Sequence, residues 1–179
     1  MDNDRRSTDT DFYADAVRAF MVKHRQTPPT TPRLGGDVPD YASACVGDVL
    51  AFAAAKVKHL HEKHGGTDLL RIRLMVEEVV ETCRGILTGN LVETADGLAD
   101  SLYVVFGTAI AYGIPIDKVF EEVHRSNMSK TPLDEHSKGG KVLKAGYSPA
   151  DVAGILRRAA GHGLVSDKHP SQGADAHSG

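Results

Sequence analysis

A short break, Thr88-Gly89-Asn90, separates two long predicted helices and constrains the fold of this chain more than any other feature. In residues 68–87, apolar side chains recur at the i, i+3, i+4 and i+7 spacing of an amphipathic helix. Residues 91–112 predict a second helix, which ends at Gly113. Because the connection is so short, we expect the two helices to lie antiparallel and side by side.

The remaining segments favour helices as well. Residues 12–24, 42–64 and 117–127 predict three of them, and a last helix is expected from Ser148 onward, with Ser148 as its N-cap. No segment alternates with the period of a strand, so the predicted fold class is all-α, a helical bundle.

Length and composition favour a single soluble domain. A chain of 179 residues has room for one modest core. We expect a flexible N-terminus over residues 1–11, an all-α domain over 12–160, and a disordered tail rich in Gly, Ser, His and Asp over 161–179. The longest stretch without charge, residues 101–116, is too short and too polar to span a bilayer.

The charge balance limits the kinds of partner. The net charge is −3, so no overall basic field holds a nucleic acid, and we expect neither a nucleic-acid nor a membrane partner. The two cysteines provide no disulfide framework, and the N-terminus lacks the apolar core of a signal peptide. A cytoplasmic protein is therefore expected.

Both central helices carry acidic side chains in register. Glu77, Glu78 and Glu81 lie within about 100° of arc on the side away from the apolar stripe. On the next helix Glu93, Asp96 and Asp100 follow the i, i+3, i+7 spacing of one face. This second helix contains no Lys or Arg that could pair with its acids.

Two interpretations of these acids are open. A solvated acidic face is the simpler one. However, the rest of the 91–112 helix is apolar all round, which predicts that it is buried and that the acidic stripe runs into the interior. A buried carboxylate is costly unless it is paired or holds a metal, and clusters made of carboxylates alone select Mg²⁺ or Mn²⁺. Such ions, held between the helices, could bridge the phosphates of a nucleotide.

A di-iron carboxylate bundle is a third hypothesis. The segment Glu121-Glu122-Val123-His124 contains a Glu-x-x-His element, from which such bundles are built. Di-iron bundles need two copies of the element, and this chain has one. The hypothesis is therefore less favoured than a magnesium site.

A polar and basic segment follows the acids. Asn127 and Lys130 lie near the end of the 117–127 helix, and Lys144 and Tyr147 follow in a Gly-rich stretch. One interpretation is a helix end decorated with cations, followed by an ordinary basic loop. The other is a local positive edge that binds phosphates through Lys and the base or ribose through Tyr.

In combination, these motifs resemble a known family. The succession Glu77-Glu78-x-x-Glu81, then Asp96-Gly97-Leu98-Ala99-Asp100, then Glu122-Val123-His124-Arg125-Ser126-Asn127-Met128-Ser129-Lys130 is similar to the MazG-like all-α NTP pyrophosphohydrolases. That superfamily includes the phosphoribosyl-ATP pyrophosphohydrolases and the dimeric dUTPases. The most similar subgroup is common in phage and bacterial genomes, and its terminal Lys-x-x-Lys-x-Gly-Tyr-x-Pro motif is matched by residues 141–149. The resemblance covers roughly residues 12–156.

The resemblance implies a reaction and a role for each matched residue. It implies hydrolysis of a (deoxy)nucleoside triphosphate to the monophosphate and pyrophosphate, with a purine dNTP or dUTP as plausible substrate and a homodimer or homotetramer as the active form. Two or more Mg²⁺ or Mn²⁺ ions are implied per site. The implied metal ligands are Glu78, Glu81, Asp96 and Asp100, the implied catalytic residue beside the metals is Glu77, and the implied substrate-binding residues are Asn127, Lys130, Lys144 and Tyr147.

One departure from the superfamily motif leaves an alternative open. The superfamily has Glu-x-x-Asp ending at position 100, whereas position 97 of this chain is glycine. Either Asp96 takes the place of that ligand, which we favour, or Glu93 and Asp96 form the pair in a shifted register. The departure also keeps open a competing class, a nucleotide-binding or helical interaction protein that has lost turnover.

Overall fold

The structure is a computed structural model that describes residues 8–131 and 146–161. Within these residues all the regular secondary structure is helical, which confirms the predicted all-α class. The six helices are α1 (Thr8–Lys23), α2 (Asp40–His64), α3 (Thr67–Leu87), α4 (Leu91–Ala111), α5 (Ile116–Met128) and α6 (Val152–Ala159). Residues 8–11, predicted to belong to a flexible N-terminus, form the first turn of α1. Residues 1–7 and most of the predicted tail, residues 162–179, lie outside the described residues.

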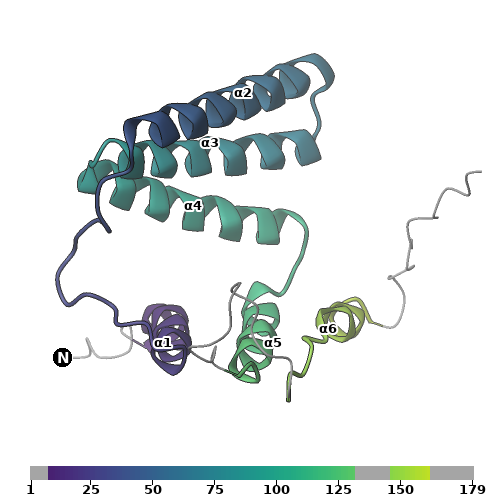
Figure 1. Ribbon diagram of the computed structural model, residues 1–179. Coiled ribbons are helices and arrows are strands. Elements are labelled where there is room, and N and C mark those ends of the chain that lie inside the picture. The colour runs from purple at the N-terminus through teal and green to yellow at the C-terminus, as the bar shows by residue number, and fades with distance from the viewer. Residues whose placement is uncertain (1–7, 132–145, 162–179) are drawn as a thin grey trace, which may run out of the picture.

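The helices form two groups (Figure 1). Helices α2, α3 and α4 lie side by side as a layer, and α3 has the most extensive packing with α4. Helices α1 and α5 pack against each other below α4, and α6 lies beside α5. The expected pairing of α3 with α4 is therefore observed, and it brings together the two helices that carry the acidic residues.

Helices α3 and α4 approach closely because two glycines lie at their crossing. A Cβ added to Gly97 would lie 2.7 Å from Thr82 Oγ1 and 2.9 Å from the Thr82 backbone nitrogen. The same arrangement recurs with the helices exchanged, because a Cβ added to Gly85 of α3 would lie 2.6 Å from the backbone nitrogen of Thr94 in α4. Both threonines are buried, so each glycine provides the space for a threonine of the opposite helix.

Aromatic side chains hold α1 against α5. The rings of Tyr13 and Phe120 meet edge to face with centroids 4.7 Å apart, and Phe106 of α4 joins them at 5.8 Å from Tyr13. The Tyr13 hydroxyl also donates to Asp117. At the other end of α1, Lys23 donates to the backbone carbonyl of Met128, so the α1–α5 pair is fixed at both ends.

Helix α6 begins later than predicted. The prediction that Ser148 caps it is wrong, because the helix starts at Val152 and its cap is Asp151, whose side chain accepts from the Gly154 N–H at 2.8 Å. Ser148 and Pro149 precede the helix instead, and both are bonded to Arg125 of α5. The residues expected to start a helix thus connect α6 to α5.

The apolar half of α4 is not buried in the single chain, which contradicts the prediction. Tyr103 is 83% exposed and Ile110 is 80% exposed, and Leu98 and Leu102 are also more than half exposed. The reason is that α3 packs along one side of α4, whereas α1 and α5 reach only part of the other side, through Phe106 and the cavity beside it. Among the described residues, the only buried apolar side chains are those of Ala16 and Ala109.

Candidate metal and nucleotide site

The structure brings five carboxylates together across α3 and α4. Burial raises the pKa of Glu78 above its ordinary value of 4.5, and the negative charges of Asp100, Glu81, Glu77 and Asp96 raise it further. Glu78 therefore lies in the field of carboxylates from both helices. We call these five residues the acidic cluster.

The members of the acidic cluster differ in exposure. Glu77 and Glu78 are half-buried, whereas Glu81, Asp96 and Asp100 are exposed. The expectation that the acidic stripe of α4 runs into the interior is therefore wrong for the single chain. The stripe instead lies at the edge of the α3–α4 packing surface, beside the buried Gly97.

Glu77, the predicted catalytic residue, has a basic partner that the sequence interpretation missed. Its Oε1 accepts from Arg73 Nε at 2.7 Å, and both side chains are about one third exposed or less. The signal was present in the sequence, because residues four apart on a helix face each other. Arg73 fixes the direction of the Glu77 carboxylate from one side.

Glu93, the alternative ligand, is held in a different environment. Its carboxylate pairs with Arg84 of α3. Its backbone N–H bonds the side chain of Asn90, the N-cap of α4, at 3.2 Å. Since Asp96 acts on the Glu78 carboxyl and Glu93 is neutralised by Arg84, the arrangement favours Asp96 over Glu93 as the partner of Asp100.

The donor chemistry of the acidic cluster fits a hard divalent cation. All five members offer carboxylate oxygens, and their mutual repulsion is what a cation relieves. In the described parts of the chain, no group of three or more His, Cys, Asp or Glu side chains is gathered closely enough to hold an ion. The fit therefore rests on the charge and the oxygen chemistry of the cluster.

The predicted phosphate-side residues meet at the C-terminal end of α5. Lys130 Nζ donates to Asn127 Oδ1 at 2.7 Å and lies 5.8 Å from the centroid of the Tyr147 ring. Three of the four predicted substrate-binding residues are thus adjacent, although Tyr147 is distant from the other two in the sequence. The fourth, Lys144, lies outside the described residues.

The acidic cluster and the Asn127–Lys130–Tyr147 group lie on different helix groups. Helix α5 leaves α4 through a bend of 115° and runs toward α1, away from the α3–α4 layer (Figure 1). Within residues 8–131 and 146–161, no hydrogen bond or ion pair joins the two sets. The single chain therefore presents the metal-type residues and the phosphate-type residues as separate surfaces.

An ion pair on α5 binds the segment that carries Tyr147, and the sequence interpretation did not single it out. Arg125 donates to both carboxylate oxygens of Glu122, at 2.8 and 2.7 Å. Arg125 also donates to Ser148 Oγ at 2.9 Å and to the Pro149 carbonyl at 3.0 Å. The hydrogen bonds from Arg125 lower the pKa of Glu122 from 4.5 to about 2.

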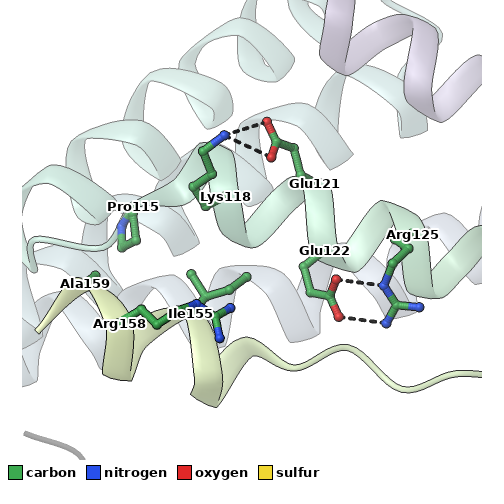
Figure 2. Close-up of a pocket in the computed structure, with 8 residues that line it drawn as sticks. All are labelled: Pro115, Lys118, Glu121, Glu122, Arg125, Ile155, Arg158 and Ala159. Atoms are coloured by element: carbon green, nitrogen blue, oxygen red, sulfur yellow. Dashed lines mark hydrogen bonds and ion pairs between the residues drawn. The ribbon is translucent and has the colours of Figure 1, made fainter. Parts of the chain in front are cut away.

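A groove of about 600 Å³ lies between α5 and α6, with this ion pair at one side (Figure 2). A second pair, Lys118 with Glu121, lines the same groove at 3.1 Å. None of the predicted site residues that the structure describes lines it. The Glu-x-x-His element is also committed elsewhere, because Glu121 binds Lys118 and the His124 ring stacks on Phe120.

An apolar cavity of about 710 Å³ lies between α1, α4 and α5. Its lining includes the partly exposed Leu102 and Val105 of α4 and Val17 and Met21 of α1. Among the described residues, no single helix is long and apolar enough to cross a membrane. Helices α4 and α5 taken together have the length and composition of a membrane span, but the pair is bent at its junction.

Comparison with known families identifies the central region. The profile of the family described as phosphoribosyl-ATP pyrophosphohydrolase matches residues 53–127, which include all of α3, α4 and the acidic cluster. This match is consistent with the resemblance to the MazG-like all-α NTP pyrophosphohydrolase superfamily. The match supports a hydrolase that acts on phosphoric anhydrides. Comparisons with curated proteins and with solved structures gave no match.

Proposed function

We propose that this protein is a metal-dependent nucleoside triphosphate pyrophosphohydrolase, which converts a (deoxy)nucleoside triphosphate and water to the monophosphate and pyrophosphate. A deoxynucleotide, either a purine dNTP or dUTP, is the proposed substrate, and the reaction would cleanse or shape the nucleotide pool. The two free cysteines and the family match are in keeping with a cytoplasmic enzyme.

The observation that carries the proposal is the electrostatic environment of Glu78. Its carboxyl is disfavoured in the charged form by burial and by four neighbouring carboxylates from two helices. A protein rarely retains such repulsion without a use for it, because each like-charged neighbour costs stability. A divalent cation between α3 and α4 would offset it, and the matched family segment contains the whole cluster.

Within this proposal, Glu78, Glu81, Asp96 and Asp100 would hold Mg²⁺ or Mn²⁺. The bound ions would neutralise phosphate charge and lower the pKa of the attacking water. Glu77 accepts a hydrogen bond from that water and orients it toward the α-phosphorus, and Arg73 keeps the Glu77 carboxylate in place. Pyrophosphate is then the leaving group.

The Asn127–Lys130–Tyr147 group binds the rest of the nucleotide in this proposal. Lys130 provides a positive charge for the phosphates, and Asn127 holds its ammonium group through the 2.7 Å hydrogen bond. The Tyr147 ring offers a flat surface for the base or the ribose. Lys144 is proposed as a second phosphate contact.

A second copy of the chain is the proposed partner, in a homodimer or a homotetramer. The support is the exposed apolar side of α4, where Leu98, Leu102, Tyr103 and Ile110 are all more than half exposed. Large exposed apolar patches are uncommon on monomeric proteins. Multi-angle light scattering tests the assembly: the wild type should have at least twice the chain mass, and Tyr103→Glu should lower it. A wild-type mass of one chain would refute the proposal.

Pyrophosphate release tests the function directly. The purified protein is incubated with a panel of canonical and modified (deoxy)nucleoside triphosphates, with Mg²⁺, with Mn²⁺ or with a chelator. We expect metal-dependent release of pyrophosphate, strongest for one deoxynucleotide, and none from Glu81→Gln. Binding of nucleotides by calorimetry without any pyrophosphate release would instead identify a nucleotide-binding protein without turnover.

A further inference from the structure

We infer that Glu122 and Arg125 are positioning residues: they hold the segment of residues 146–151 against α5 and thereby place Tyr147 beside Lys130. We call residues 146–151 the Tyr147 segment. The inference rests on the proposed function for one point, that Tyr147 contacts the nucleotide. The contacts that carry it are independent of that function.

Both members of the pair bind the Tyr147 segment directly. Arg125 reaches Ser148 Oγ at 2.9 Å and the Pro149 carbonyl at 3.0 Å. Glu122 Oε1 accepts from the Asp151 backbone N–H at 2.9 Å. The pair therefore contacts three residues of the segment, two of them through backbone atoms, which fixes the path of the main chain rather than a single side chain.

A third contact extends the attachment to the residue next to Tyr147. The Ser148 backbone N–H donates to Ser129 Oγ at 2.8 Å, and Ser129 Oγ in turn donates to the Ser126 carbonyl at 2.7 Å. Ser129 follows the last residue of α5, and Lys130 comes directly after it. The backbone on both sides of the Tyr147–Lys130 contact is thus anchored to the same end of α5.

The geometry distinguishes a positioning residue from a direct phosphate ligand. A guanidinium has five N–H donors. In Arg125, two go to Glu122, one to Ser148 and one to Pro149, which leaves a single donor. The adjacent carboxylate of Glu122 also neutralises its charge. Arg125 is therefore committed to the segment, whereas the Lys130 ammonium, bonded to Asn127, keeps donors for a phosphate.

The electrostatics agree with a permanent ion pair. The hydrogen bonds from Arg125 and from the Asp151 N–H lower the pKa of Glu122 to about 2, and the bonds to Glu122 raise the pKa of Arg125. Both groups are therefore charged throughout the physiological pH range.

A matched control lies on the same helix, about one turn away. Lys118 and Glu121 form an ion pair with the same i, i+3 spacing, at 3.1 Å, and they line the same groove (Figure 2). In the described residues, neither side chain bonds the Tyr147 segment. Glu121→Gln therefore removes an ion pair from α5 without removing a contact to that segment.

The first measurement follows the segment itself and needs no substrate. The chain has no tryptophan, so Tyr147→Trp introduces a single indole whose fluorescence and acrylamide quenching report the environment of position 147. Arg125→Lys, which keeps the charge but loses the planar fork, and Glu122→Gln should each make the indole more accessible to quencher. Glu121→Gln should leave the quenching unchanged.

The second measurement uses the proposed reaction, in chains that retain Tyr147. Arg125→Lys and Glu122→Gln should raise KM for the nucleotide about tenfold, while kcat changes less than threefold. Glu121→Gln should leave both unchanged. A merely structural role would lower the active fraction and kcat and leave KM as it is.

Three results would overturn the inference. The first is unchanged quenching in Arg125→Lys and Glu122→Gln. The second is an equal change in Glu121→Gln. The third is a raised KM with an indole that stays protected, because Arg125 would then contact the nucleotide directly. Absence of pyrophosphohydrolase activity in the wild type would refute the proposed function alone, since the quenching experiment still decides whether Glu122 and Arg125 hold the segment.

Discussion

Gly97 provides the sharpest test of how α3 and α4 pack. Replacement by alanine adds a Cβ that would lie 2.7 Å from Thr82 Oγ1, 2.9 Å from the Thr82 nitrogen and 3.0 Å from its Cα. Ordinary contacts of a Cβ begin at 3.4 Å, so the shortfall against the backbone is about 0.5 Å. A rotamer change of Thr82 relieves only the hydroxyl contact, and the two helices must therefore separate.

The expected magnitude follows from two opposing terms. Overpacking of a close contact costs about 1 to 3 kcal/mol, and the upper part of that range applies because backbone atoms cannot rotate away. Alanine gains about 1 kcal/mol over glycine within a helix. The net effect of Gly97→Ala is a destabilisation of about 1 to 2 kcal/mol, which lowers Tm by roughly 2 to 8 °C for a chain of this size.

The control is Gly47, a glycine within α2 whose added Cβ would meet nothing within 4 Å. Gly47→Ala gains the helix term without a clash and should raise Tm by about 2 to 4 °C. Thermal melting followed by circular dichroism at 222 nm compares both variants with the wild type. If Gly97→Ala raises Tm as Gly47→Ala does, the close approach of α3 and α4 at Thr82 is wrong.

Four further predictions address the charged groups. Glu81→Gln and Asp100→Asn should each abolish metal-dependent pyrophosphate release and leave the helical circular dichroism intact; wild-type rates in either would remove these residues from the proposed ligand set. Because the folded-state pKa of Glu78 is raised above 4.5, ionisation of Glu78 opposes folding as the pH rises. In the absence of metal, Glu78→Gln should therefore raise Tm more at pH 7 than at pH 4. An equal rise at both pH values would contradict the repulsion. Lys130→Ala should cost no more than about 1 kcal/mol of stability but lower kcat/KM roughly tenfold to a hundredfold, as melting and steady-state kinetics on the same sample can show. The folded-state pKa of Glu122 is lowered to about 2, so the stabilising contribution of its ionised form is complete above pH 4.5 and is lost as the pH falls. The Tm difference between the wild type and Glu122→Gln should therefore shrink below pH 4.5. A constant difference would argue against an ionised pair.

The secondary structure could be predicted because its signals are local. The apolar spacing of residues 68–87 and the break at Gly89 gave α3 and the start of α4 to within a residue. Gly89 has a φ of +70°, a conformation that a side chain disfavours, so the end of α3 is encoded at that position. The start of α6 was mispredicted because Ser148 and Asp151 are both good caps, and contacts to Arg125 and Ser129 decide between them.

The exposure of α4 could not be predicted from its sequence. An apolar helix indicates that its surface is covered, but it does not say whether another helix of the same chain or another molecule covers it. The exposure of Asp96 and Asp100 could not be predicted either, because it depends on which side of α4 faces α3. The ion pair of Arg73 with Glu77 could have been predicted from its i, i+4 spacing.

The packing of α3 against α4 explains why position 97 is a glycine. As a departure from the superfamily motif, it raised the hypothesis of a protein that has lost turnover. In the structure, position 97 faces Thr82 across the helix crossing, where a ligand side chain would have no space. Asp96, the preceding residue, lies at the edge of that crossing and contributes to the field around Glu78. The absence of an acid at position 97 is therefore explained by packing, and it no longer argues against a carboxylate site.

Helix α4 thus presents a packed side and an exposed side with different consequences. Thr94 and Gly97 face α3 and set how closely the two helices approach. Asp96 and Asp100, at the edge of that contact, share the field of the α3 carboxylates, so their separation from Glu78 depends directly on the glycine packing. The exposed Tyr103 lies seven residues after Asp96 and three after Asp100, so it shares their side of α4 and faces away from Gly97. A change at Gly97 should therefore alter the proposed metal affinity together with stability, whereas a change at Tyr103 should alter the proposed assembly and leave the α3–α4 packing as it is.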